Sequence, residues 1–333
     1  MKVEIIAEVA QAHDGSLGIL HSYIDALAKA GVDTLKFQMH IAEAESSDKE
    51  PFRINFSYED DTRYDYWNRM GFTFDQWKEI KAHCKEVGVN FLCSPFSIKA
   101  CQWLKELGET RIKIASGEIE NNLMHDYIIG FASEVLISSG MSTIADLEKC
   151  ETFYCSKSIK TSVFQCTTAY PTPAEEIGLN VIDELLESFD CAVGLSDHSG
   201  EIFPSLGAVS KGASKLEFHA VFDKRMFGPD SSSSLDMDQI KELVKGVRFL
   251  EKVLSNPTDK HNADKFDQLK KMFGKSLAVN KDLVSGHIIQ ASDLESKKPA
   301  GEGYSTANYL DLINKKLNKN LSKYSFINST DFE

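Results

Sequence analysis

The chain has 333 residues, of which 42% are hydrophobic and 26% charged, as expected for a globular protein with one large domain and a small appendage. Its 50 acidic against 37 basic side chains give a formal charge of -13, which argues against a broad nucleic-acid-binding surface. No stretch approaches membrane-spanning length, and Glu4 and Glu8 interrupt the first apolar run, so we expect neither a membrane span nor a signal peptide. The seven cysteines are odd in number and unclustered, which is typical of reduced cysteines in a cytoplasmic protein. We therefore expect a cytoplasmic protein that binds neither nucleic acid nor membrane.

Taken in chain order, short apolar runs alternate with segments of helical periodicity. The expected strands are 3–9, 34–38, 90–93, 111–115, 135–138, 162–166, 192–195 and 215–219. The expected helices are 20–30, 74–87, 99–107, 123–131, 144–153, 179–189, 202–212 and 237–254. Eight strand and helix pairs predict an α/β protein with a closed (β/α)₈ barrel over residues 1–255, with an open doubly wound sheet as the alternative.

Three segments fall outside this alternation. Residues 42–72 form a connection rich in aromatic and arginine side chains, which is typical of a lid or a binding segment, although a self-packed surface loop is the alternative. Residues 256–274 are expected to be a linker. Residues 275–333 predict a small second domain with short strands, including 276–279, and a helix-like segment at 309–317.

Polar residues gather at the carboxyl ends of the predicted strands, where a barrel of this kind places its active site. In strand order they are Glu8; Lys36 and Gln38; Ser94; Lys113, Ser116 and Glu118; Ser138 and Ser139; Thr168 and Tyr170; Ser196 and His198; Glu217 and His219. Because His198 and His219 end neighbouring parallel strands, they are candidate ligands of one divalent cation. Two hydrogen-bonded structural histidines are the alternative.

The same residue types indicate a reaction class. Lys36 and Lys113, flanked by hydroxyl groups, suit a ligand with a phosphate and a carboxylate. A metal held by the histidines would polarise a carbonyl, while Glu8 and Glu118 would orient hydroxyls or move protons. The combination predicts a metal-dependent reaction between a carbonyl electrophile and a small phosphorylated, carboxylated donor.

Several motifs together resemble the sialic acid synthase family. They are AEVAQAHDGS at 7–16, LKFQMH at 35–40, SPFS at 94–97, KIASGE at 113–118, SGM at 139–141, QCTTAYPTP at 165–173, GLSDH at 194–198 and GPD at 228–230. The resemblance implies a (β/α)₈ TIM barrel followed by a small antifreeze-protein-like (SAF) domain at 275–333. It also implies condensation of phosphoenolpyruvate with an N-acylated amino-hexose and water, giving a nine-carbon 2-keto sugar acid and phosphate.

The resemblance also implies a role for individual residues. His198 and His219 would bind a divalent metal, most often Mn²⁺, with Mg²⁺ or Co²⁺ as alternatives, and Glu118, Glu8 and His198 would be catalytic. Lys298 would reach the site from a partner chain in a domain-swapped homodimer. The substrate-binding residues would be Lys36, Gln38, Ser94, Phe96, Lys113, Ser116, Thr168, Tyr170, Ser196 and Asp230, with Lys298.

The sequence leaves more than one acceptor sugar and more than one function open. Thr168 stands where some family members have asparagine, and Phe218 where a basic residue is common, so the acceptor is expected to be N-acetylmannosamine or a related 2-acetamido or 2,4-diacetamido sugar. A Schiff-base aldolase using Lys36 or Lys113 is a second enzymatic interpretation. A non-catalytic sugar-binding protein on a degenerate barrel is a third.

Overall fold

A computed structural model describes residues 2–54, 56 and 58–333. The chain divides into two compact units, Met1–Asn256 and Pro257–Glu333. No helix in the described part of the chain is both long and apolar enough to cross a membrane.

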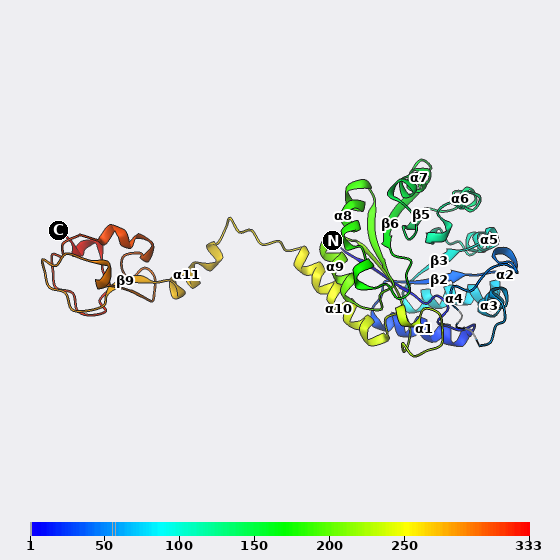
Figure 1. Ribbon diagram of the computed structural model, residues 1–333, viewed down its shortest axis with the longest axis horizontal. Coiled ribbons are helices and arrows are strands. Elements are labelled where there is room, and N and C mark those ends of the chain that lie inside the picture. Colours follow the sequence, from blue (N-terminus) through cyan, green and yellow to red (C-terminus); the bar gives the residue numbers. More distant parts are fainter. Residues whose placement is uncertain (1, 55, 57) are drawn as a thin grey trace. The chain divides into compact units, whose positions relative to one another are not determined.

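The first unit is a closed barrel of parallel strands in sequence order, in which β1 pairs with both β2 and β8 (Figure 1). The strands are β1 (Glu4–Glu8), β2 (Thr34–Met39), β3 (Asn90–Pro95), β4 (Arg111–Ile114), β5 (Glu134–Ser138), β6 (Lys160–Cys166), β7 (Ala192–Asp197) and β8 (Lys215–His219). This confirms the predicted (β/α)₈ barrel and excludes the open doubly wound sheet.

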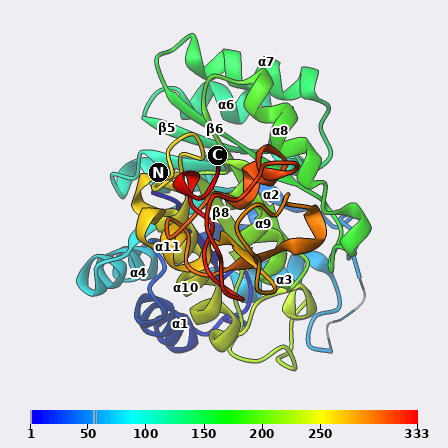
Figure 2. The ribbon, with the colours of Figure 1, turned by 90° about the vertical axis from the view of Figure 1, so that its left-hand side faces the viewer.

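Helices surround the strands on the outside of the barrel (Figure 1). They are α1 (Leu17–Ala30), α4 (Phe74–Val87), α5 (Ile98–Glu106), α6 (Asn122–Ile128), α7 (Ile144–Cys155), α8 (Leu179–Ser188), α9 (Phe203–Lys211) and α10 (Met237–Leu254). Neighbouring helices contact one another, as α1 and α4 do in Figure 2. Their apolar faces and the outward side chains of the strands form the main core.

Local sequence signals set the helix ends. Ser16 accepts a hydrogen bond from the backbone N–H of Ile19, and Gly31 ends α1 with a left-handed φ of 89°. Thr73 and Gln76 form a reciprocal capping box at the start of α4. Helical periodicity together with glycines such as Gly31 placed the helices to within a turn from sequence, whereas the Ser16 cap was not used and the first helix begins three residues earlier than expected.

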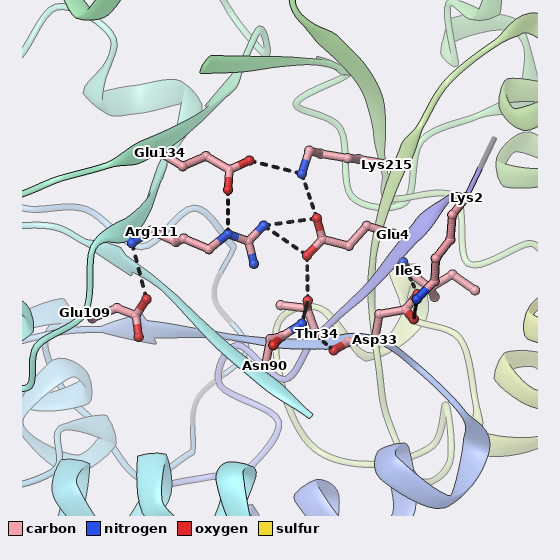
Figure 3. A network of polar contacts seen from close by, with 10 residues as sticks. All are labelled: Lys2, Glu4, Ile5, Asp33, Thr34, Asn90, Glu109, Arg111, Glu134 and Lys215. Atoms are coloured by element: carbon pink, nitrogen blue, oxygen red, sulfur yellow. Dashed lines mark hydrogen bonds and ion pairs between the residues drawn. The ribbon is translucent and has the colours of Figure 1, made fainter. Parts of the chain in front are cut away.

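The amino end of the barrel is closed by a ring of ion pairs inside the strands (Figure 3). Arg111 donates to both carboxylate oxygens of Glu4 at 3.0 Å and to Glu134 at 2.7 Å. Lys215 donates to Glu4 at 2.6 Å and to Glu134 at 3.2 Å. Two positive and two negative side chains thus neutralise one another, and the sequence analysis did not predict this ring.

The long connection between β2 and α4 is not a loop without structure. It contains the helices α2 (Ala42–Glu45) and α3 (Arg63–Met70). Ala42, Tyr66, Trp67 and Met70 form a small buried cluster of their own. The segment therefore packs on itself, as one of the two interpretations held, and it also lines the cavity described below.

The second unit has its own small core, built from Leu277, Val279, Leu283, Ile289, Leu312, Leu317, Leu321 and Ile327. The strand predicted at 276–279 is β9 (Ser276–Val279), and it pairs antiparallel with β10 (Leu294–Lys297). Helix α11 (Asp267–Phe273) lies inside the segment expected to be a linker, where none of its residues is buried. That the unit is an antifreeze-protein-like domain stays a prediction.

The prediction of a helix-like segment in the second unit is wrong in part. The segment at 309–317 was expected to be helix-like, but the structure has a 3₁₀ helix at Thr306–Leu312 that breaks at Asn308. Leu317 then forms a β-bridge with Phe332. The core of this unit is small, so pairing with distant segments decides the conformation more than local periodicity does.

Candidate active site

A cavity of about 370 Å³ lies at the carboxyl ends of the strands. Its lining comes from the ends of β1, β2, β3, β4, β6 and β8 and from the connection that contains α2 and α3. The lining residues are Gln11, Gln38, His40, Glu45, Glu50, Arg53, Arg63, Trp67, Phe96, Ala115, Ser116, Gly117, Glu118, Tyr170, His219, Pro229 and Asp230. The barrel therefore has a recess where the sequence analysis placed the active site.

His198 and His219 lie side by side at this end of the barrel, with ring centroids 5.2 Å apart. His198 Nδ1 is 2.9 Å from the carbonyl oxygen of Thr167, and since a carbonyl only accepts, Nδ1 must be the donor. Nε2 of His198 is then left with a free lone pair. Burial and the neighbouring His219 lower the pKa of His198 to about 4, so this imidazole is neutral near pH 7.

His219 contacts acidic groups on two sides. Its Nε2 is 3.2 Å from Glu8 Oε2, and its Nδ1 is 4.0 Å from Asp230 Oδ2. The ring of Tyr170 stacks on His198 with centroids 4.2 Å apart. In the described part of the chain, no three His, Cys, Asp or Glu side chains are grouped as a metal site, so a cation here would rely on the two imidazoles and on ligands from outside the protein.

A buried network of lysines and carboxylates lies next to the histidines. Strand register brings Glu8 level with both Lys36 and His219. Lys36 Nζ lies 2.7 Å from Glu8 and 2.8 Å from Glu217. Glu217 also accepts from Ser196 Oγ at 3.0 Å and lies 3.0 Å from Lys113 Nζ. The two lysines, the two glutamates and Ser196 are all buried, so the four charged groups interact with little solvent between them.

The two lysines differ in their electrostatic environment. Burial alone would lower the pKa of Lys36, but Glu217 and Glu8 outweigh it and raise this pKa above its ordinary value. For Lys113, burial outweighs the attraction of Glu217, so its pKa is lowered. Burial would raise the pKa of Glu217, yet the two lysines hold it well below the usual range. Lys36 is therefore the firmly charged member of the pair.

Two buried polar atoms beside this network have unused hydrogen-bonding capacity. Ser94 Oγ has no hydrogen-bond partner among the described residues, although the side chain is only 1% exposed. Lys113 Nζ approaches Glu217 without completing a hydrogen bond to any described residue and lies 3.8 Å from the centroid of the Phe164 ring. Buried groups of this kind are costly unless a ligand or water satisfies them.

Gly140 brings two further hydroxyl-bearing residues together. A Cβ added at Gly140 would lie 2.1 Å from Ser116 Cβ and 2.8 Å from Thr168 Oγ1, and its φ is 37°. Only glycine allows the chain after β5 to approach the chains after β4 and β6 this closely. Ser116 and Thr168 thus flank the same point at the carboxyl end of the barrel.

Glu118 lies in a 3₁₀ helix at Ser116–Glu118 and lines the cavity. Burial raises the pKa of its carboxyl group, an effect that a hydrogen bond from Asn121 Nδ2 at 2.7 Å only partly offsets. A carboxyl group with a raised pKa can hold a proton closer to neutral pH than an ordinary glutamate does.

The sequence of residues 23–259 matches the NeuB family. This span covers more than half of the chain. The chain belongs to the NeuB family. It is therefore an enzyme of the sialic acid synthase type, as its motifs predicted.

Named relatives of this NeuB-family enzyme align along nearly its whole length. It is 31% identical to an N,N'-diacetyllegionaminic acid synthase of Campylobacter jejuni, over 98% of this chain and 99% of the relative. It is 32% identical to a pseudaminic acid synthase of the same species, over 99% and 97%. It is 30% identical to human N-acetylneuraminate-9-phosphate synthase, over 94% and 88%.

Solved structures share the fold of the NeuB-family chain. A sialic acid synthetase of Leptospira borgpetersenii superposes with a TM-score of 0.71 at 24% identity, covering 81% of this chain and 91% of that one. A spore coat polysaccharide biosynthesis protein of Bacillus subtilis gives 0.65 at 23% identity, covering 100% and 95%.

Most of the residues predicted from sequence come together in the NeuB-family barrel. Gln38, Phe96, Ser116, Glu118, Tyr170, His219 and Asp230 line the cavity. Glu8, Lys36, Lys113 and Ser196 belong to the buried network, while Ser94, Thr168 and His198 lie at the same strand ends. Lys298 belongs to the second unit, where its Nζ lies 5.3 Å from the centroid of the Phe273 ring.

Glu217, which the sequence analysis placed at the end of its strand without assigning it a role, connects both lysines to Ser196. Other residues at the site were not predicted. Arg53 pairs with Asp230 at 2.6 Å, and its guanidinium lies 4.0 Å from the centroid of the Tyr170 ring. Residues such as Arg53 come from an irregular connection, where no periodicity shows which side chains face the cavity.

Proposed function

We propose that this NeuB-family enzyme condenses phosphoenolpyruvate with an N-acylated amino-hexose and water, giving a nine-carbon 2-keto sugar acid and phosphate. The relatives named as legionaminic, pseudaminic and sialic acid phosphate synthases support the product class. The observation that carries the proposal is the buried Lys36 and Lys113 pair, with unused donors on Lys113 and Ser94, directly beside His198 and His219.

The donor end suits phosphoenolpyruvate. Lys36 and Lys113 supply positive charge, and Ser94, Ser116, Thr168 and Ser196 supply hydroxyl donors for phosphate and carboxylate oxygens. Because Glu8 and Glu217 form ion pairs with the lysines, the ammonium groups are held in fixed positions before substrate binds.

The two histidines suit a divalent cation, for which we propose Mn²⁺, with Mg²⁺ or Co²⁺ as alternatives. His198 offers Nε2, because Nδ1 is occupied by the Thr167 carbonyl, and His219, whose ring centroid lies 5.2 Å from that of His198, would be the second ligand. When bound, such an ion supplies Lewis-acid polarisation of the acceptor aldehyde.

The acceptor end is the cavity. Glu8, Gln38, Tyr170 and Asp230 would bind hydroxyl and amide groups of the sugar, and Phe96 would contact an apolar face of it. Gln38 donates to Glu8 at 2.6 Å, which fixes the carboxylate that would orient the sugar. Glu118, with its raised pKa, is suited to hold or move a proton near the reacting carbons.

We also propose that the second unit is the antifreeze-protein-like domain implied by the motifs and that the enzyme is a domain-swapped homodimer. Lys298 of one chain would then add a positive charge to the active site of its partner. Its single ammonium group supplies charge without the bidentate geometry of an arginine.

A phosphate-release assay tests the proposed function. Phosphoenolpyruvate is incubated with the protein, Mn²⁺ and one N-acylated hexosamine at a time, and the product is identified by mass spectrometry. We expect phosphate release only when the donor, the acceptor and the metal are all present, with a 2-keto sugar acid as product. Full activity after chelation, together with borohydride trapping of a substrate on Lys36 or Lys113, would instead establish the Schiff-base aldolase.

A further inference from the structure

We propose that Asn121 is a positioning residue, which fixes the orientation and the charge state of the Glu118 carboxylate at the edge of the cavity. Asn121 is not among the described residues that line the cavity, so it would act through Glu118 and not on the substrate. The inference rests on the proposed function, because it takes Glu118 as the group that holds or moves a proton near the reacting carbons.

Asn121 and Glu118 belong to one tight turn after β4. The 3₁₀ helix Ser116–Glu118 opens the turn, and α6 begins at the residue after Asn121. The backbone N–H of Asn121 donates to the carbonyl oxygen of Glu118 at 3.0 Å, which closes the turn. The Asn121 side chain therefore starts from a backbone position that is fixed relative to Glu118.

The side-chain amide of Asn121 has a different partner at each end. Its Oδ1 accepts from the backbone N–H of Met124 at 3.2 Å and caps α6. Its Nδ2 donates to Glu118 Oε2 at 2.7 Å. Because a backbone N–H only donates and a carboxylate only accepts, these two partners allow a single orientation of the amide. The cap on the helix thus aims the donor at Glu118.

The backbone of the turn has a second support that does not involve the Asn121 side chain. His125 Nε2 lies 3.0 Å from the carbonyl oxygen of Ile119 and must donate to it, so Nδ1 accepts from Tyr154 Oη at 2.5 Å. His125 is 3% exposed and Tyr154 is fully buried. Loss of the Asn121 donor should therefore release the carboxylate of Glu118 while the turn stays in place.

The hydrogen bond from Asn121 also acts on the charge of Glu118. Burial raises the pKa of this carboxyl group, Asn121 opposes the rise, Glu45 adds to it and His40 opposes it. Cys101 of α5 is the other titratable side chain that interacts with Glu118. A donor to the ionised form stabilises that form, so removal of the Asn121 donor should raise the pKa of Glu118 further.

Two variants separate the donor from the helix cap. Asn121→Ser keeps an oxygen that can cap α6 but removes the donor to Glu118, and serine is as favourable as asparagine at this position. Asn121→Asp keeps the cap and the size of the side chain but places an acceptor with negative charge against Glu118 Oε2. We therefore expect both variants to fold, with the larger effect on Glu118 in Asn121→Asp.

Asn122→Asp is the matched control. It adds the same charge at the next residue, which is exposed and has no hydrogen bond to Glu118 among the described contacts. Solvent screens an exposed charge, so kcat should stay within about twofold of the wild type and the pKa of Glu118 should change little. A rise in pKa as large as that in Asn121→Asp would contradict the role of the direct contact.

The pKa of Glu118 is measured by carbon NMR on the full chain with ¹³C-labelled glutamate side chains, and the Glu118 signal is the one that Glu118→Gln removes. Phosphate release gives kcat and the KM for phosphoenolpyruvate in parallel. In Asn121→Ser we expect a higher pKa, a kcat about tenfold lower, and a KM for phosphoenolpyruvate within about twofold of the wild type. An unchanged pKa would overturn the inference, and so would an unchanged kcat in an enzyme that releases phosphate.

The two readouts keep this inference apart from the proposed function. The NMR titration requires no turnover, so a higher pKa in both Asn121 variants of a protein that never releases phosphate supports the contact while the proposed condensation fails. Wild-type phosphate release with the same pKa and kcat in both variants leaves the condensation standing and removes the role of Asn121.

Discussion

Glu217 is the residue that holds the proposed phosphoenolpyruvate site together. It is 1% exposed, accepts from Lys36 and Ser196, and lies 3.0 Å from Lys113. Its carboxylate places negative charge close to where an anionic substrate would bind, which is unfavourable in itself. Its geometric role must therefore outweigh that cost, because it fixes three donors that belong to three different strands.

Glu217→Gln tests this role. The amide keeps the size of the side chain but offers only one acceptor oxygen, and its NH₂ group would face an ammonium. We expect the KM for phosphoenolpyruvate to rise about ten- to hundredfold, while the KM for the sugar changes little. Glu217→Asp, which keeps the charge, should show a smaller rise. Equal increases in both KM values, or none, would contradict the positioning role.

The candidate site was predictable where side chains follow a strand. Lys36, Lys113 and His219 lie at strand positions whose period of two places them inside the barrel, and His198 directly follows β7. The same period would have placed Lys215 inside the barrel together with the predicted Glu217, because both alternate with Leu216 and Phe218 on β8. Arg53 and Glu45 could not be predicted, because their positions depend on how an irregular segment packs.

At the scale of elements, Gly140 allows the chain segments that follow β4, β5 and β6 to lie close together. Its φ of 37° and the 2.1 Å distance from a built Cβ to Ser116 Cβ mean that any side chain there would displace Ser116 or Thr168.

Gly140→Ala should therefore raise the KM for phosphoenolpyruvate at least about tenfold and lower the Tm by several degrees. Gly18→Ala in α1 serves as the control, because a Cβ there meets only Ser16 Oγ at 4.0 Å and alanine is the better helix former. Kinetics and thermal unfolding of both variants check this prediction. A Gly140→Ala enzyme with wild-type kinetics would show that the close approach is not needed.

The ion-pair ring at the amino end of the barrel should set part of the acid stability. Burial would raise the pKa of Glu4, but Lys215 and Arg111 outweigh it and lower this pKa from 4.5 to about 2. A carboxyl group with a depressed folded-state pKa stabilises the protein above its unfolded-state pKa, and this stabilisation is lost as the pH falls from about 4.5 to about 2.

Glu4→Gln should lower the free energy of unfolding at pH 7 by about 2 kcal/mol, because Arg111 and Lys215 lose a partly buried charged partner. It should also flatten the loss of stability between pH 4.5 and pH 2. Denaturant unfolding over this pH range measures both effects. Asp238→Asn removes an exposed ion pair with Lys241 and should cost less than about 0.5 kcal/mol; an equal loss in both variants would contradict the role of the ring.

Element boundaries in the barrel followed from sequence because the helices bury an apolar face and several of them begin at a side-chain cap or end at a left-handed glycine. The helix α11 was missed for the opposite reason. None of its residues is buried, and Leu269, Met272 and Phe273 are exposed, so the helix has no core-facing side that would have identified it. The helix expected at 309–317 failed because pairing with the C-terminal residues competes with helix formation there.

At the scale of the whole molecule, the proposed domain-swapped dimer predicts complementation between two defective chains. His198→Ala should be inactive with an unchanged far-UV circular dichroism spectrum, and Lys298→Ala should have strongly reduced activity. Mixing them should restore activity, because one of the two sites in a hybrid dimer then has both His198 and the partner's Lys298. Failure of mixed, subunit-exchanged samples to regain activity would contradict the crossover.

The bond that breaks in phosphoenolpyruvate tests the central claim most directly. The donor is prepared with heavy oxygen in the bridging position between carbon and phosphorus, and turnover is started with an N-acylated hexosamine and Mn²⁺. Addition of water at the enol carbon with C–O cleavage sends the heavy oxygen into inorganic phosphate, and mass spectrometry of the phosphate should find it there. Recovery of the heavy oxygen in the sugar acid, or phosphate release that does not require the sugar, would contradict the proposed condensation.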